Sequence, residues 1–138
     1  MQIREPAVAG QFYPRDPREL RRMVEQFCAA LEPGGAERVA AVIAPHAGYI
    51  YSGPTAGYAY ARIRGKTPDR VFLLGSSHRY AIHGASVFQS GAFDTPLGSF
   101  PVDDALAGTL AREWGSHSEQ PHLSEHSLEV QLPFLWVV

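Results

Sequence analysis

The two most informative stretches of this sequence read VAAVIAPH at residues 39–46 and RVFLLGSSH at residues 70–78. Each is a short run of apolar, mostly branched residues, and each is followed by a histidine. Runs of this length and composition are typical of strands buried on both faces, as in a parallel sheet. We therefore expect two parallel strands, with His46 and His78 just beyond their ends.

The segment between these stretches contains a helix signal. Ser52 or Gly53 can cap a helix whose first turn contains Pro54 and which runs to about Ile63. Residues 39–74 then form a strand, a loop, a helix and a strand, which is a βαβ unit with a right-handed crossover. This unit predicts an α/β fold with a mainly parallel central sheet flanked by helices, similar in class to other open α/β folds.

Further elements are predicted from local signals on both sides of this unit. Asp16 followed by Pro17 and Glu19 is a helix start, because it combines an N-cap, a proline at the first position and a glutamate three residues after the cap. The remaining expectations are an end of that helix at residues 33–35, a strand at 85–89, a tight turn at 93–98, a helix from Asp103 to a stop at Gly115, and helical structure over 125–136 interrupted by Pro133.

Composition limits the classes of protein to consider. The 138 residues suit one domain, and 45 % hydrophobic with 19 % charged residues is typical of a globular chain. A net charge of −2 without a basic cluster argues against a nucleic-acid partner. No apolar segment reaches the length of a signal peptide or of a membrane span, so we expect no membrane association and a cytoplasmic location.

Two smaller features carry expectations of their own. Cys28 is the only cysteine, which excludes an internal disulfide and a cysteine-cluster metal site, and we expect a buried, inert thiol. Residues 132–138 are mostly apolar and contain no signal that ends a helix. We therefore expect residues 1–138 to be one α/β domain that is incomplete at its C-terminal end, or whose end is covered by a second subunit.

The two histidines suggest a metal site. Ligands of open α/β sheets bind beyond the carboxyl ends of the strands, so neighbouring strands would bring His46 and His78 to one spot. Neutral imidazole is a common ligand of iron, copper and zinc. Two histidines leave such a site one ligand short, and a carboxylate is the commonest completion for non-haem Fe(II). The alternative is that both histidines merely hydrogen-bond to the backbone at strand ends.

Three further side chains are candidates for the same pocket. His126, which follows Glu125, could be an acid–base or substrate-binding group, or an ordinary residue of a helix start. Tyr49 and Tyr51 lie close to the first histidine in sequence. A phenolic hydroxyl from either could bind substrate, although such aromatic residues more often pack in a wall.

Four blocks of this sequence resemble the MEMO family. They read REPAVAGQFYP at residues 4–14, APHAGYIYSG at 44–53, GSSH at 75–78 and EHSLEVQLPF at 125–134. The blocks stand in the family's order and span nearly the whole chain. The family takes its name from a mediator of cell motility, and its bacterial and archaeal relatives are called AmmeMemoRadiSam system protein B. Ser76 or Ser77 stands where proline or a similar residue is usual in the family.

The resemblance implies a fold like that of class III extradiol dioxygenases, which use non-haem iron. It implies that His46 and His78 are metal ligands and that His126 lines the same pocket. Family members run to roughly twice this length, and their third ligand and a further active-site histidine lie beyond the part that matches this chain. Relatives have been linked to metal-dependent redox chemistry, to peptide binding and to a radical-SAM partner protein.

These observations leave three functional hypotheses. The first is a metal-dependent oxidoreductase or dioxygenase-like enzyme that uses Fe(II) or copper, with zinc less expected. In it, His46 and His78 bind the metal, His126 is catalytic, and Tyr49 and Tyr51 bind a small-molecule or peptide substrate of unknown identity. The second is a non-catalytic module that binds a peptide or partner protein in the same pocket, and the third is a zinc hydrolase.

Overall fold

The structure is a computed structural model that describes residues 2–29, 38–116 and 118–138. In these ranges the chain combines helices with a small sheet, which confirms the α/β class. The elements in chain order are β1 (Ile3–Arg4), α1 (Pro17–Cys28), α2 (Tyr49–Ala61), β2 (Ala92–Thr95), β3 (Gly98–Pro101), α3 (Asp104–Glu113), α4 (Gln120–Leu123), the 3₁₀ helix η1 (Glu129–Gln131) and α5 (Leu132–Val137).

The sheet is mixed, and the prediction of a mainly parallel sheet is wrong for the described residues. Its strand order is β1-β2-β3, with β1 parallel to β2 and β2 antiparallel to β3. The turn between β2 and β3 was predicted and is confirmed. Thr95 stabilises it, because its Oγ1 donates to the carbonyl of Gly98 at 2.8 Å and accepts the N–H of Leu97 at 3.1 Å.

The three strands expected at residues 39–44, 70–74 and 85–89 are not formed. A strand needs a backbone partner, and no described residue forms a backbone–backbone hydrogen bond with either of the first two segments. At residues 85–89, side chains take the place of a ladder: the N–H of Val87 donates to Ser116 Oγ and that of Gln89 to Glu119 Oε1. The predicted βαβ unit is therefore absent.

Helices with side-chain caps begin where the sequence predicts. Asp16 accepts the N–H groups of Arg18 and Glu19 at the start of α1, and Asp103 accepts the N–H of Leu106 at the start of α3. Gly115, with φ of 64°, follows the end of α3 as expected for a left-handed stop. The predicted end of the first helix, at residues 33–35, lies outside the described residues.

Two other helices differ from prediction. Helix α2 begins at Tyr49 instead of after Ser52, because its first N–H donates to the Phe12 carbonyl at 2.8 Å and needs no side-chain cap. Residues 125–128 are not helical, and only η1 and α5 follow them. Pro133 does not break a helix, since it lies in the first turn of α5, where a missing N–H loses no hydrogen bond.

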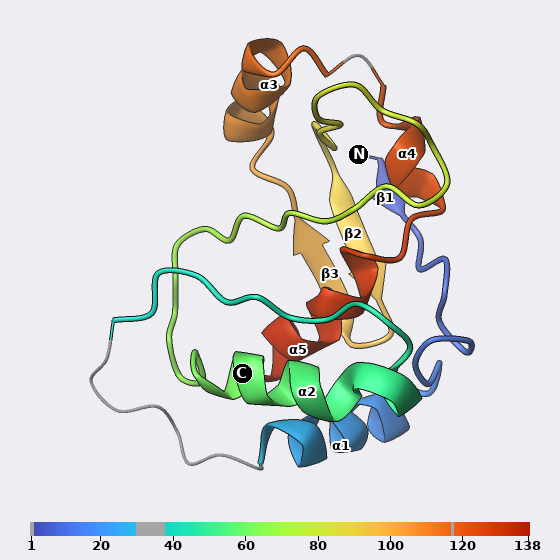
Figure 1. Ribbon diagram of the computed structural model, residues 1–138, viewed down its shortest axis with the longest axis vertical. Coiled ribbons are helices and arrows are strands. Elements are labelled where there is room, and N and C mark those ends of the chain that lie inside the picture. The colour runs from blue at the N-terminus through green and yellow to red at the C-terminus, as the bar shows by residue number, and fades with distance from the viewer. Residues whose placement is uncertain (1, 30–37, 117) are drawn as a thin grey trace.

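The core lies where α1, α2 and α5 pack together at one end of the molecule, while α3 lies at the other end beyond the β2–β3 hairpin (Figure 1). Leu20, Val24 and Phe134 are fully buried there, and Cys28 is buried as predicted. Helices α1 and α2 approach closely, because a Cβ at Gly57 would overlap the backbone of Phe27. Among the described residues, no helix has the length and apolar character needed to cross a membrane.

Candidate metal centre

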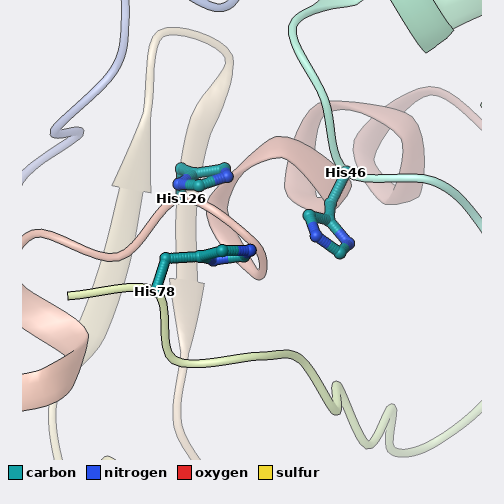
Figure 2. Close-up of side chains that lie close together, drawn as sticks. All are labelled: His46, His78 and His126. Carbon is teal, nitrogen blue, oxygen red and sulfur yellow. The ribbon is translucent and has the colours of Figure 1, made fainter. Parts of the chain in front are cut away.

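Three histidines from distant parts of the sequence lie together (Figure 2). His46 precedes α2, His78 lies in the connection from α2 to β2, and His126 lies between α4 and η1. The ring centroids of His46 and His78 are 5.1 Å apart, and those of His46 and His126 are 5.9 Å apart. His78 and His126 stack at 4.6 Å with an interplanar angle of 26°.

The three rings present nitrogen atoms at a spacing that suits one metal ion. One ring nitrogen from each histidine lies within 4.8 Å of the other two. At a metal–nitrogen distance of about 2.1 Å, two nitrogens bound to one ion are at most about 4.2 Å apart, so little movement closes the group around an ion. The structure thus brings together the two predicted ligands and the predicted catalytic histidine, although the predicted strands are absent.

His126 is more sheltered than His78, because its side chain is 15 % exposed against 40 % and the Phe12 ring lies 4.7 Å away. Burial lowers the pKa of His126 below its ordinary value, and the nearby imidazoles of His78 and His46 lower it further against the opposing charge of Glu125. A lowered pKa keeps the imidazole neutral, which is the form that binds a metal or accepts a proton.

Glu125 lies beside both His78 and His126 and is buried. Burial alone would raise the pKa of Glu125, but the backbone N–H of His78 and of Ser127, the His78 ring and the backbone N–H of His126 outweigh it. They lower the pKa to about 2. Glu125 is therefore a carboxylate whose oxygens are engaged with N–H groups, and it is not a member of the histidine group that could hold a metal.

The segment 125–131 supplies polar anchors at every second residue. Its buried polar side chains are Glu125, Ser127, Glu129 and Gln131. Ser127 Oγ donates to the Ser76 carbonyl at 2.8 Å, close to His78 in sequence. Gln131 Nε2 donates to the Pro45 carbonyl at 3.2 Å, next to His46. One short segment thus contacts the chain beside both predicted ligands.

A buried ion pair joins this segment to the N-terminal block. Arg4 pairs with Glu129, and both side chains are almost fully buried. Glu129 also accepts the N–H groups of Ala7 at 2.9 Å and Val8 at 3.0 Å, and the Tyr13 hydroxyl at 2.7 Å. The carboxylate of Glu129 therefore neutralises the buried charge of Arg4 and fixes the N-terminal loop at the same time.

The two tyrosines predicted to bind substrate lie in different surroundings. Tyr49 is buried between Phe27 and Phe134, and its hydroxyl donates to the Val130 carbonyl at 2.7 Å. That hydroxyl already has a partner in the core, and a role of Tyr49 in substrate binding stays a prediction. Tyr51 is 81 % exposed on α2, and its role in substrate binding stays a prediction.

A cavity of about 980 Å³ lies beside the histidine group. Its lining is largely apolar and comes from the connection between α2 and β2, from α3 and α5, and from residues next to α3 and η1, including Phe72, Leu74, Leu110, Trp114 and Leu128. Glu125 and Ser127 also line it, and the three histidines do not. Several lining residues are open to solvent, since Phe72 is 60 % and Leu74 is 83 % exposed.

Sequence reasoning missed the residues that hold the histidines in place. The sequence predicts Glu125 only as the first residue of helical structure over 125–136, and it indicates no role for Arg4, Ser127, Glu129 and Gln131. A local signal was present, because polar residues alternate with Leu, Val and His over residues 125–131 without the period of a surface helix.

Comparison with known proteins gives one consistent result. The sequence profile of the Memo-like protein family matches residues 4–138. A MEMO1 family protein of Aquifex aeolicus is 44 % identical over 136 residues, covering 98 % of this chain and 50 % of that protein. MEMO1 family proteins of Methanothermobacter thermautotrophicus and Aeropyrum pernix are 44 % and 43 % identical, covering 96 % and 98 % of this chain and 52 % of each relative. The chain spans about half the length of the curated relatives it matches.

Proposed function

The chain belongs to the Memo-like protein family, and we propose that it contributes a histidine-based metal centre to a metal-dependent oxidoreductase. The observation that carries the proposal is the group of three imidazole nitrogens within 4.8 Å of one another. Imidazole suits iron, copper and zinc, and does not favour the hard cations magnesium and calcium. We propose Fe(II) or copper, because the resemblance to non-haem iron dioxygenases implies a redox metal.

We propose that His46 and His78 bind the metal and that His126 holds or accepts a proton at the substrate. A metal bound by His46 and His78 would supply redox and Lewis-acid chemistry beside the substrate. His126 suits proton transfer because its imidazole stacks on His78 at 4.6 Å, beside the proposed metal. Phe12 against the His126 ring limits the access of water on that side.

The test is metal content of the purified protein and of histidine variants. We expect one equivalent of Fe(II) or copper after reconstitution, measured by inductively coupled plasma mass spectrometry. His46→Ala and His78→Ala should lose most of it, because each removes a ligand. His126→Ala should keep the metal, because His126 is not assigned as a ligand. His83→Ala, which removes an exposed histidine outside the group, is the matched control and should bind as the wild type does.

The outcomes separate the parts of the proposal. Unchanged metal content in both His46→Ala and His78→Ala contradicts the ligand assignment. Loss of the metal in His126→Ala makes that residue a third ligand. A protein that selects zinc over iron and copper, and shows no reversible redox change by electron paramagnetic resonance, contradicts the oxidoreductase and favours a hydrolase.

A second candidate is a binding module for an extended apolar peptide, and the large cavity favours it. Its lining residues Phe72 and Leu74 are exposed, and the segment 70–74 has no backbone–backbone hydrogen bond with any described residue. Such a segment can add a peptide strand by main-chain hydrogen bonding. The surface beside the metal centre therefore suits an apolar strand.

A fluorescent peptide of alternating valine and threonine, flanked by lysines, is a suitable probe for this candidate. Binding measured by anisotropy should weaken at least tenfold in Leu74→Asp and should survive both EDTA and His46→Ala. Affinity that disappears with the chelator contradicts a binding function independent of the metal. The exposed Tyr58→Asp, on α2 and outside the cavity, is the control for added charge.

A further inference from the structure

Glu125 contacts His78 through both of its carboxylate oxygens. Oε2 accepts the backbone N–H of His78 at 2.6 Å, and Oε1 lies 2.9 Å from the ring nitrogen Nδ1 of the same residue. One buried side chain thus binds the backbone and the ring of a single histidine. His78 itself is 40 % exposed and lies in a segment without backbone–backbone partners among the described residues, so its ring is held by this contact and by stacking on His126.

The remaining contacts of Glu125 decide which partner donates. Oε1 also accepts the N–H groups of His126 at 2.8 Å and Ser127 at 2.9 Å. An ionised carboxylate only accepts hydrogen bonds, so Nδ1 of His78 must carry the proton that it shares with Glu125. A neutral imidazole has one N–H, and Nε2 is then left with a lone pair, which is the atom that can bind a metal.

The backbone of Glu125 is also held in place, by Arg4. Its backbone carbonyl accepts the Nη2 of Arg4 at 2.5 Å, and Arg4 is buried against Glu129. The side chain of Glu125 is only 7 % exposed, so it has little freedom to leave the two histidines. The N-terminal block therefore holds the backbone of Glu125, and the carboxylate of Glu125 holds the ring of His78.

We propose that Glu125 is a positioning residue that holds the proton of His78 on Nδ1 and presents Nε2 as the ligand atom. The inference rests on the proposed metal centre for its purpose, but its geometry stands without a metal. Hydrogen bonds of this kind to metal-binding histidines raise the basicity of the ligand nitrogen, and their loss typically weakens metal affinity by about 10- to 100-fold.

The first test reads the tautomer of His78 in metal-free wild-type protein. Long-range ¹H–¹⁵N correlation spectra of protein labelled on histidine nitrogen, recorded at mildly alkaline pH, distinguish Nδ1–H from Nε2–H rings. The resonance of His78 is assigned by its loss in His78→Ala. We expect one Nδ1–H tautomer for His78 before any metal is added. A dominant Nε2–H tautomer, or fast exchange between the two, would overturn the proposal.

The second test compares Glu125→Gln with Glu119→Gln. Glutamine keeps the shape of Glu125 but replaces one acceptor oxygen by a donor, so the His78 ring should become a mixture of tautomers and the Co(II) affinity should fall about 10- to 100-fold. Glu119 also accepts a backbone N–H, from Gln89, but contacts none of the three histidines, and its variant should change neither reading. An unchanged tautomer in Glu125→Gln contradicts the proposal.

These readings keep the two proposals apart. A wild-type protein that shows the Nδ1–H tautomer but binds no Co(II), Fe(II) or copper refutes the metal centre and leaves the positioning role of Glu125 standing. A protein that binds metal through His46 and His78 while His78 is an Nε2–H ring refutes the positioning role and leaves the metal centre.

Discussion

The segment 125–131 and the segments 39–46 and 70–78 carry the same site but are held in opposite ways. The first buries four polar side chains and fixes them with hydrogen bonds and an ion pair. The other two expose apolar residues, with Ile43 97 % and Leu74 83 % exposed, and form no backbone–backbone bonds with described residues. The difference shows that buried side chains, and not strand pairing, bring the histidines together in this structure.

The largest expected effect on stability comes from removing the carboxylate of Glu129 in the segment 125–131. Glu129→Ala leaves the buried charge of Arg4 unpaired and removes the acceptor of Ala7, Val8 and Tyr13. We expect a loss of about 3–5 kcal/mol in the free energy of unfolding, measured with urea. The control is Glu25→Gln, which breaks the half-exposed pair with Arg21 and should cost less than about 0.5 kcal/mol. Equal losses would remove the distinction between anchored and exposed contacts.

Acid should lower the free energy of unfolding by protonating Glu125 in the same segment. The pKa of Glu125 is lowered from 4.5 to about 2 in the folded protein, so its contribution to stability is present above about pH 4.5 and is lost as the pH falls toward 2. The loss is at most about 3 kcal/mol. Unfolding free energies measured across this range should fall more steeply for the wild type than for Glu125→Gln. Parallel curves would contradict the role of this carboxylate in stability.

A smaller effect is expected where the core helices meet. Gly57→Ala places a Cβ against the backbone of Phe27, which cannot move aside as a flexible side chain does, and should cost about 1–3 kcal/mol. The control is Gly108→Ala in α3, where a Cβ has room and the helix should gain about 0.5–1 kcal/mol. Thermal unfolding followed by circular dichroism measures both, and shifts of the same sign would contradict the packing of α1 on α2.

The smallest effects on stability should occur in the segments 39–46 and 70–78, whose apolar residues are exposed. Ile43→Thr and Leu74→Thr remove apolar surface that is already in water, so each should change the free energy of unfolding by less than about 0.5 kcal/mol. Leu20→Ala, which removes a fully buried side chain, is the contrast and should cost about 2–5 kcal/mol. A loss above about 1 kcal/mol in either threonine variant would mean that these residues are covered in solution.

The parts of the fold that the sequence predicts are those with local causes. Asp16 and Asp103 cap α1 and α3 through their own side chains, and Thr95 closes its own turn, so a few neighbouring residues suffice. The prediction of strands at 39–44 and 70–74 is wrong. Apolar composition indicates that a segment is suited to a strand, but the strand forms only if a partner elsewhere in the fold pairs with it.

The sequence predicts the histidines of the candidate site, but it does not predict the residues that hold those histidines in place. His46 and His78 stand out because each follows a short apolar run, and His126 because it lies in a block that resembles the MEMO family. Glu125 and Glu129 look like surface carboxylates until their partners, 47 and 125 residues away in sequence, are known. Charged residues are almost never fully buried unless paired, and no pattern in one sequence reveals such distant pairs.

The position of Cys28 provides a reporter that needs no engineering. Its thiol is the only one in the sequence, it is 1 % exposed at the end of α1, and burial raises its pKa. A maleimide reagent can therefore react only when α1 separates from its neighbours, because the reactive thiolate is scarce and shielded until then. The rate of alkylation, followed by mass spectrometry, therefore measures how often the helical core opens, and it can be compared among the variants above.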